Sequence, residues 1–98
     1  MNVIDRRHAR ILMKEHPEAA RAIEQWWRTA RRAGWSSLAD CSEIYKSADL
    51  VGRVLVFAIL GNHYRLITVV SWRGQRIYVK ALLTHAEYMR NLWHKWAF

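Results

Sequence analysis

The chain has 98 residues, enough for one modest hydrophobic core, which excludes two independently folded domains. Its 16 Lys and Arg against 8 Asp and Glu leave a net charge of +8, a surplus that favours a polyanionic partner, most often nucleic acid. No apolar run approaches the roughly 18 residues of a membrane span and the only cysteine is Cys41, so we expect one cytoplasmic domain, residues 1–98, with no disulfide and no membrane association.

The N-terminal third is predicted to be helical. Residues 1–4 are apolar and suit either an edge strand or the approach to a helix, which Asp5 can cap and which runs to about residue 15. Pro17 disfavours helix in the residue before it and can open a second helix. In that second helix, apolar residues recur at spacings of four and three until Gly34: Ala19, Ile23, Trp26, Ala30 and Ala33.

Cations on the second helix lie off this apolar stripe. Arg21, Arg28, Arg31 and Arg32 form either a solvated face or a surface that contacts nucleic acid. Ser37 can then cap a short helix to about residue 43, and residues 47–53 are predicted to be a loop.

Three β-rich runs follow, at residues 54–60, 64–72 and 76–83. The turns between them, at residues 61–62 and 73–75, contain glycine, so the runs are predicted to form an antiparallel meander. Strict alternation in the third run predicts a core face of Ile77, Val79, Ala81 and Leu83, and an opposite face of Arg76, Tyr78 and Lys80.

Thr84 and Glu87 have the spacing of a capping box, which predicts that a last helix begins at residue 85. Its apolar stripe is Tyr88, Met89, Leu92, Trp93 and Trp96, and we expect this end to be docked on the domain or covered by a partner. The capping box does not explain His85 and Tyr88, which lie in the first turn, where a helix favours an anion such as phosphate. The predicted fold class is therefore α+β, with N-terminal helices packed on a small meander and a C-terminal helix.

The residue pattern restricts the chemistry. The five histidines include no His-x-x-x-His pair, no serine elbow occurs, and the four glycines are far apart, so we expect no metal and no cofactor. Metal-independent RNA cleavage needs only a base, an acid and cations around the reacting phosphate. The candidates for these catalytic roles are Arg65, Lys80, His85 and Tyr88, and the candidates for RNA binding are Lys46, Arg53, His63, Arg73 and Arg76.

These candidates also have ordinary structural explanations. Arg65 could pair with a carboxylate across the sheet, Tyr78 could be a packed cross-strand aromatic residue, and His63 could be a solvated turn residue. On composition and spacing alone, an RNA nuclease ranks only slightly above a plain nucleic-acid-binding module.

The sequence resembles the HigB-type toxins of bacterial type II toxin–antitoxin systems, within the RelE-like group. The resemblance is carried by Gly61-Asn62-His63-Tyr64-Arg65 and Thr84-His85-Ala86-Glu87-Tyr88, and extends to Ile77-Tyr78-Val79-Lys80, Ser47-Ala48-Asp49 and His16-Pro17-Glu18. It implies a RelE-like fold and an mRNA interferase that cleaves mRNA in the A site of the 70S ribosome. It also implies a cognate helix-turn-helix antitoxin, similar to HigA, that holds the toxin inactive.

Two other functions fit the same resemblance. One is a non-catalytic inhibitor that binds RNA or the ribosome, and the other is a topoisomerase-poisoning relative on the same fold.

Overall fold

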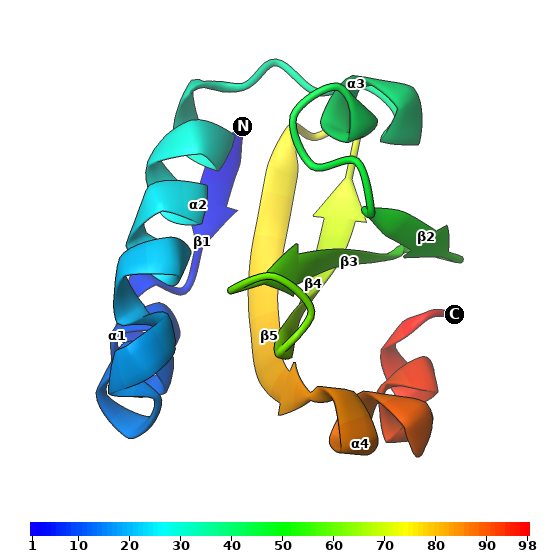
Figure 1. Ribbon diagram of the computed structural model, residues 1–98. Helices are drawn as coiled ribbons and strands as arrows, with labels where there is room; N and C mark the ends of the chain where they lie inside the picture. Colours follow the sequence, from blue (N-terminus) through cyan, green and yellow to red (C-terminus); the bar gives the residue numbers. More distant parts are fainter.

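The computed structural model describes residues 1–98 and contains a five-stranded mixed sheet with the order β1-β5-β4-β3-β2 (Figure 1). The strands are β1 (Asn2–Ile4), β2 (Asp49–Val51), β3 (Val54–Ile59), β4 (Tyr64–Ser71) and β5 (Arg76–Thr84). The α-helices are α1 (Arg6–Glu15), α2 (Ala20–Arg32), α3 (Leu38–Ser42) and α4 (His85–Met89), and the 3₁₀ segments are η1 (Pro17–Ala19) and η2 (Leu92–Trp96). The predicted α+β class is confirmed.

The N-terminal helices α1 and α2 form as predicted, α1 from a side-chain cap and α2 from its apolar stripe. The Asp5 carboxylate accepts from the His8 amide at 3.1 Å, and Pro17 opens η1, which leads directly into α2. The stripe of α2 is buried, and the Trp26 ring packs edge-on against Phe57 of β3, with centroids 5.4 Å apart. Helix and sheet are thereby joined into one core.

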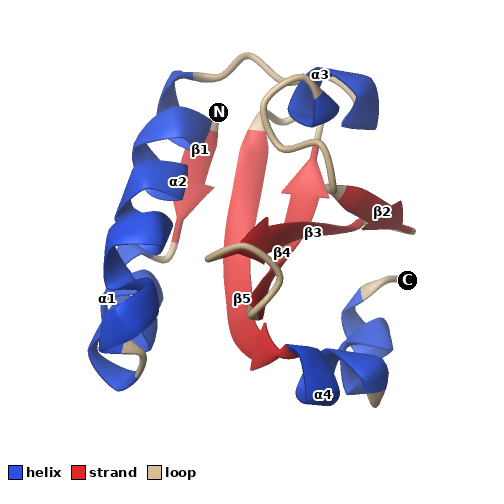
Figure 2. Ribbon diagram, in the orientation of Figure 1, coloured by secondary structure: helices blue, strands red, loops and turns tan.

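The sheet lies between two layers of helical segments, which Figure 2 shows on either side of the strands. Helices α1 and α2 cover one face, where the larger cluster of 18 buried residues lies, and we call this the helical face. The C-terminal segment packs against the other face, over a smaller cluster that includes Val54, Ile67, Trp93 and Ala97, and we call this the C-terminal face. No helix has the length and apolar character needed to cross a membrane.

The predicted faces of the third strand are wrong beyond Val79, because a β-bulge interrupts the alternation. Ile67 pairs with Ala81 and Thr68 pairs with Val79, so Lys80 has no partner on β4. Ala81 and Leu83 therefore lie on the C-terminal face with Tyr78, and Leu82 lies on the helical face. An extra residue of this kind leaves no mark in a run of apolar side chains, so the sequence predicted unbroken alternation.

Both sheet edges depend on short strands. β1 pairs in parallel with β5, which resolves the two alternatives for residues 1–4 in favour of an edge strand. The loop predicted at residues 47–53 is wrong in part, because β2 pairs antiparallel with β3 and brings Asp49 opposite Val56. A three-residue strand is held by its partner's backbone, so its own side chains predict little.

The last helix is shorter than predicted. Its backbone turns at Asn91, which has a φ of 60°, and continues as η2. The expected docking is confirmed, since Trp93 and Ala97 are buried, but Met89 and Leu92 are 61% and 65% exposed and do not belong to a buried stripe. The break at Asn91 rotates the second half of the segment, and this changes which side chains face the sheet.

Gly52 gives the first testable prediction, because it lies in the β2–β3 turn with a φ of +58° and a Cβ there would collide with the Ala97 carbonyl oxygen. Gly52→Ala should lower the free energy of unfolding by about 1 to 2 kcal/mol or more, since both the backbone and the C-terminal contact are strained. Urea denaturation measures this. Gly34→Ala is the matched control, because no atom lies within 4 Å of the place its added methyl group would take, and it should change stability by about 0.5 kcal/mol or less. Equal effects of the two variants would contradict the prediction.

Candidate RNA-cleavage site

Arg65 and Tyr88, two of the predicted catalytic residues, meet on the C-terminal face. The Arg65 guanidinium carbon lies 5.6 Å from the centre of the Tyr88 ring, a cation–π contact between β4 and α4. Its Nη1 donates to the carbonyl oxygens of Asn62 and Tyr64, both at 3.2 Å. No carboxylate pairs with Arg65, so the expected alternative of a cross-strand ion pair does not apply and its charge remains available to an anion.

Tyr88 is held in place by Trp93. The two rings stack with centroids 5.1 Å apart and planes 4° apart, and the Trp93 indole N–H donates to the Tyr88 carbonyl at 3.0 Å. Burial raises the pKa of the Tyr88 phenol, the nearby Asp49 carboxylate raises it further, and the positive charge of Arg65 acts in the opposite direction. The phenol is therefore protonated at neutral pH and can donate a hydrogen bond.

Lys80 lies on the same face as Arg65, at the bulge of β5. Its ammonium nitrogen is 5.8 Å from the centre of the Tyr78 ring, and its backbone carbonyl contacts the His8 imidazole Nε2 at 2.8 Å. The neighbouring position on β4 is Ile67, two residues from Arg65, so the two cations are separated along the strand by about 7 Å. The bulge therefore places Lys80 on the same face as Arg65, and no carboxylate pairs with it.

His85 is exposed at the first position of α4, three residues before Tyr88 and thus on the same side of the helix. The capping box is confirmed, since the Thr84 hydroxyl accepts from the Glu87 amide at 3.2 Å and the Glu87 carboxylate accepts from the Thr84 amide at 2.9 Å. The anion site predicted at this helix start stays a prediction. Helix α4 has only 5 residues, and the amides of Thr84 and Glu87 at its start are already bonded within the capping box.

The predicted RNA-binding residues do not form one group. His63 is exposed in the β3–β4 turn, near Arg65. Arg73 and Arg76 lie at the other end of the meander, beyond or beside Ser71, which is about 20 Å along β4 from Arg65, and Lys46 follows α3 at that same distant end. Arg53 is engaged elsewhere, because its Nε donates to the Trp96 carbonyl at 2.9 Å. The order of residues along the chain could not separate these positions, since the two ends of each strand in a hairpin lie far apart in space and only one of them is near Arg65.

Other reactive groups lie outside this region. Burial raises the pKa of the Cys41 thiol to about 11, so it is protonated at neutral pH and is a poor nucleophile. No three His, Cys, Asp or Glu side chains are grouped so that they could hold a metal ion.

Glu87 makes the stability depend on pH. The Thr84 amide lowers the pKa of Glu87 below its usual 4.5, so the capping box contributes stability above that value and loses it as the pH falls through the lower, folded-state pKa. Glu87→Gln should therefore lose less stability than the wild type between about pH 7 and about pH 3, measured as the change in urea midpoint. Glu15→Gln, at an exposed carboxyl of α1, is the control and should behave as the wild type. An unchanged acid sensitivity in Glu87→Gln would contradict this role.

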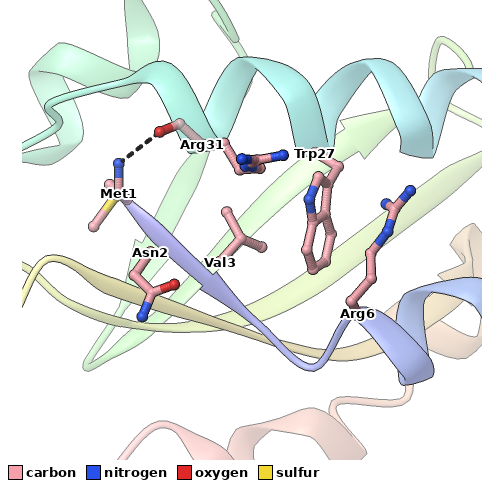
Figure 3. A pocket seen from close by; sticks show the side chains of 6 residues that line it. All are labelled: Met1, Asn2, Val3, Arg6, Trp27 and Arg31. Atoms are coloured by element: carbon pink, nitrogen blue, oxygen red, sulfur yellow. Dashed lines mark hydrogen bonds between the residues drawn. The ribbon is translucent and has the colours of Figure 1, made fainter.

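A hollow between β1 and α2 lies on the helical face, away from this site (Figure 3). The Arg6 guanidinium lies 4.6 Å from the Trp27 ring centre and pairs with Glu24 at 2.8 Å. Glu24 also pairs with Arg28 at 3.6 Å, as its spacing suggests. The ion pair of Arg6 with Glu24 thus joins α1 to α2 beside the hollow, while the Arg6 Nη1 is buried without a hydrogen-bond partner.

The sequence analysis gave no catalytic role to Tyr64, Glu18 and His16, which contact one another at the end of the sheet beside the β3–β4 turn. The Tyr64 hydroxyl donates a short hydrogen bond to the Glu18 carboxylate, and the His16 ring packs edge-on to Tyr64 with centroids 5.3 Å apart. This bond lowers the pKa of Glu18 and raises the pKa of Tyr64. In the sequence, His16-Pro17-Glu18 indicates only the start of a helix. The one signal that could have pointed to this contact with Tyr64 is that an imidazole and a carboxylate lie two residues apart.

Comparison with known proteins identifies a family for this chain. No curated protein matches the chain. A model of the HigB_toxin family, described as the RelE-like toxic component of a toxin–antitoxin system, matches residues 19–91, which include β2 to β5 and α4. The matched part thus includes Arg65 on β4, Lys80 on β5 and Tyr88 on α4. The chain belongs to the HigB_toxin family of RelE-like toxins of toxin–antitoxin systems.

Proposed function

We propose that this toxin is a metal-independent endoribonuclease that cleaves mRNA in the A site of the 70S ribosome, with residues 1–98 forming one toxin domain. The observation that carries the proposal is the contact of the Arg65 guanidinium with the Tyr88 ring, beside Lys80 and with no carboxylate neutralising either cation. In RNA cleavage the 2′-oxygen attacks phosphorus, and negative charge grows on the phosphate oxygens. Arg65 and Lys80 stabilise that charge, and the groups available for proton transfer are His85 and Tyr88.

The second part of the proposal concerns partners. Membership of a toxin–antitoxin family implies a cognate antitoxin, and we propose a helix-turn-helix protein similar to HigA that forms an inactive complex with this chain. An acidic partner suits the net charge of +8. We also propose that the toxin acts in the cytoplasm, where ribosomes and mRNA are found, and that His63 contacts RNA near the site while Lys46, Arg53, Arg73 and Arg76 supply longer-range attraction.

Mapping the 5′ ends of transcripts after induction tests the proposal. The wild-type protein should arrest growth and generate new 5′ ends within translated mRNA. His85→Ala and Lys80→Ala, each confirmed to be expressed and folded, should relieve the arrest and lower the number of new ends. Arrest that persists undiminished in both variants would overturn these site assignments.

The same experiment separates the competing functions. Growth arrest without new 5′ ends would favour a non-catalytic inhibitor that binds RNA or the ribosome. DNA damage with intact mRNA would favour a topoisomerase poison on this fold. Either result would overturn the nuclease.

A further inference from the structure

Three segments that are distant in sequence surround one hollow at the end of the sheet. It is lined by Glu18 of η1, Leu60, His63 and Tyr64 of the β3–β4 hairpin, and Thr84 at the end of β5. His16 packs on Tyr64 at its side, and Glu87 of α4 is close enough for the charges of Glu87 and His16 to influence each other. The hollow itself is therefore lined by one imidazole, one carboxylate and one phenol, and the His16 imidazole lies at its side.

Within this group, the contacts orient one imidazole. The His16 Nδ1 lies 3.8 Å from the Glu18 carboxylate oxygen, and that carboxylate is itself held by the Tyr64 hydroxyl. His16 is 27% exposed, so its ring is fixed on one side and open to solvent on the other. A carboxylate that orients an accessible imidazole is a typical arrangement for moving a proton near neutral pH.

The hollow is also adjacent to the cationic site. Tyr64 and Arg65 are consecutive, so their side chains point to opposite faces at the end of β4. The Arg65 guanidinium folds back to the Asn62 carbonyl, within the turn that carries His63. An RNA strand that crosses the end of the sheet can thus meet the hollow on one side and Arg65 on the other.

From this juxtaposition, and resting on the proposed nuclease function, we propose that His16, at the side of the hollow, is the general base of the RNA-cleavage site. His16 accepts the proton of the 2′-hydroxyl, whose oxygen attacks the adjacent phosphorus. The bond from phosphorus to the 5′-oxygen breaks, and that oxygen takes a proton from His85 or Tyr88, the groups named above for proton transfer. The products are a 2′,3′-cyclic phosphate and a 5′-hydroxyl, and the protons return to balance when His16 and the proton donor exchange with water. Glu18 and Tyr64 are positioning residues, because they act through His16.

Purified full-length toxin, added to a translation extract containing a defined mRNA, tests this assignment. His16→Gln should cleave about 100-fold more slowly than the wild type, or slower still, at neutral pH. It should retain the wild-type affinity for the same RNA carrying 2′-deoxy substitutions, which cannot be cleaved, because Arg65 and Lys80 are intact. Glu15→Gln, one residue before His16 on α1 and outside the hollow, should cleave at the wild-type rate.

A second variant separates proton transfer from structural support. Tyr64→Phe keeps the ring against His16 and removes only the hydroxyl that holds Glu18. It should slow cleavage less than His16→Gln, lowering kcat while leaving KM for the mRNA unchanged, because the hydroxyl acts only by orienting Glu18 and, through it, His16.

The outcomes are distinct. Wild-type cleavage with equally fast cleavage by His16→Gln would overturn this inference and leave the nuclease intact. No cleavage by the wild type would overturn the proposed function itself. If His16→Gln fails to fold, Tyr64→Phe decides, and a kcat equal to that of the wild type would overturn the role of the hollow.

Discussion

Arg65→Ala should lower the rate of mRNA cleavage by about 100-fold or more, because it removes a positioned cation from the phosphate charge that develops in the transition state. Arg65 is suited to this role because no carboxylate neutralises it and the Tyr88 ring and two backbone carbonyls hold its guanidinium. The measurement is the appearance of new 5′ ends over time in a translation extract containing purified toxin. Growth arrest on induction should be lost in parallel.

Two further variants make the Arg65 result interpretable. Arg65→Lys keeps the charge but loses the planar fork, so it should recover only part of the activity if two phosphate oxygens are bound at once. Arg10→Ala removes an equal charge from an exposed position on α1 and should cleave almost as fast as the wild type. A wild-type rate in Arg65→Ala would exclude this residue from the site, and an equal loss in Arg10→Ala would indicate an effect of net charge alone.

Trp26→Ala should lower the free energy of unfolding by about 3 to 5 kcal/mol, the largest effect on stability that we expect. The Trp26 side chain is fully buried and touches Phe57, so its removal leaves a cavity where α2 meets the sheet. The indole N–H of Trp26 has no hydrogen-bond partner, so the substitution breaks no hydrogen bond and the expected loss of stability comes from packing. In a domain of this size each kcal/mol corresponds to a shift in Tm of about 4 to 8 °C, which calorimetry or circular dichroism measures easily.

The control for Trp26 is an apolar residue at the surface. Ile44 is 56% exposed, and Ile44→Ala should change stability by about 0.5 kcal/mol or less. A Trp26→Ala variant as stable as the wild type would mean that the core closes around the lost ring or that α2 does not pack as described.

Some elements could be predicted from the sequence and others could not, and the reason is physical. Caps at Asp5, Ser37 and Thr84 were predictable because each requires only residues three positions apart. The meander was predictable because its two turns are short. The bulge at Lys80 was not, since only the register between β4 and β5 reveals an unpaired residue.

The candidate site shows the same division. His85 and Tyr88 are neighbours on one helix turn, so their shared position follows from local spacing. The contact of Arg65 with Tyr88 depends on how the last segment folds over the C-terminal face, and the break at Asn91 controls that path. The bond from Tyr64 to Glu18 joins positions 46 residues apart, which no local pattern can indicate.

The sequence by itself determined a small basic α+β protein, its helix caps, its central meander and its likeness to a family of toxins, because these depend on composition and on neighbours along the chain. Only the tertiary structure decided that Arg65 and Lys80 share a face, that Arg73 and Arg76 lie far from them, and that His16 and Glu18 join the same end of the sheet. Those distances are set by strand register and by the docking of helices, where each side chain is positioned by residues remote from it in sequence.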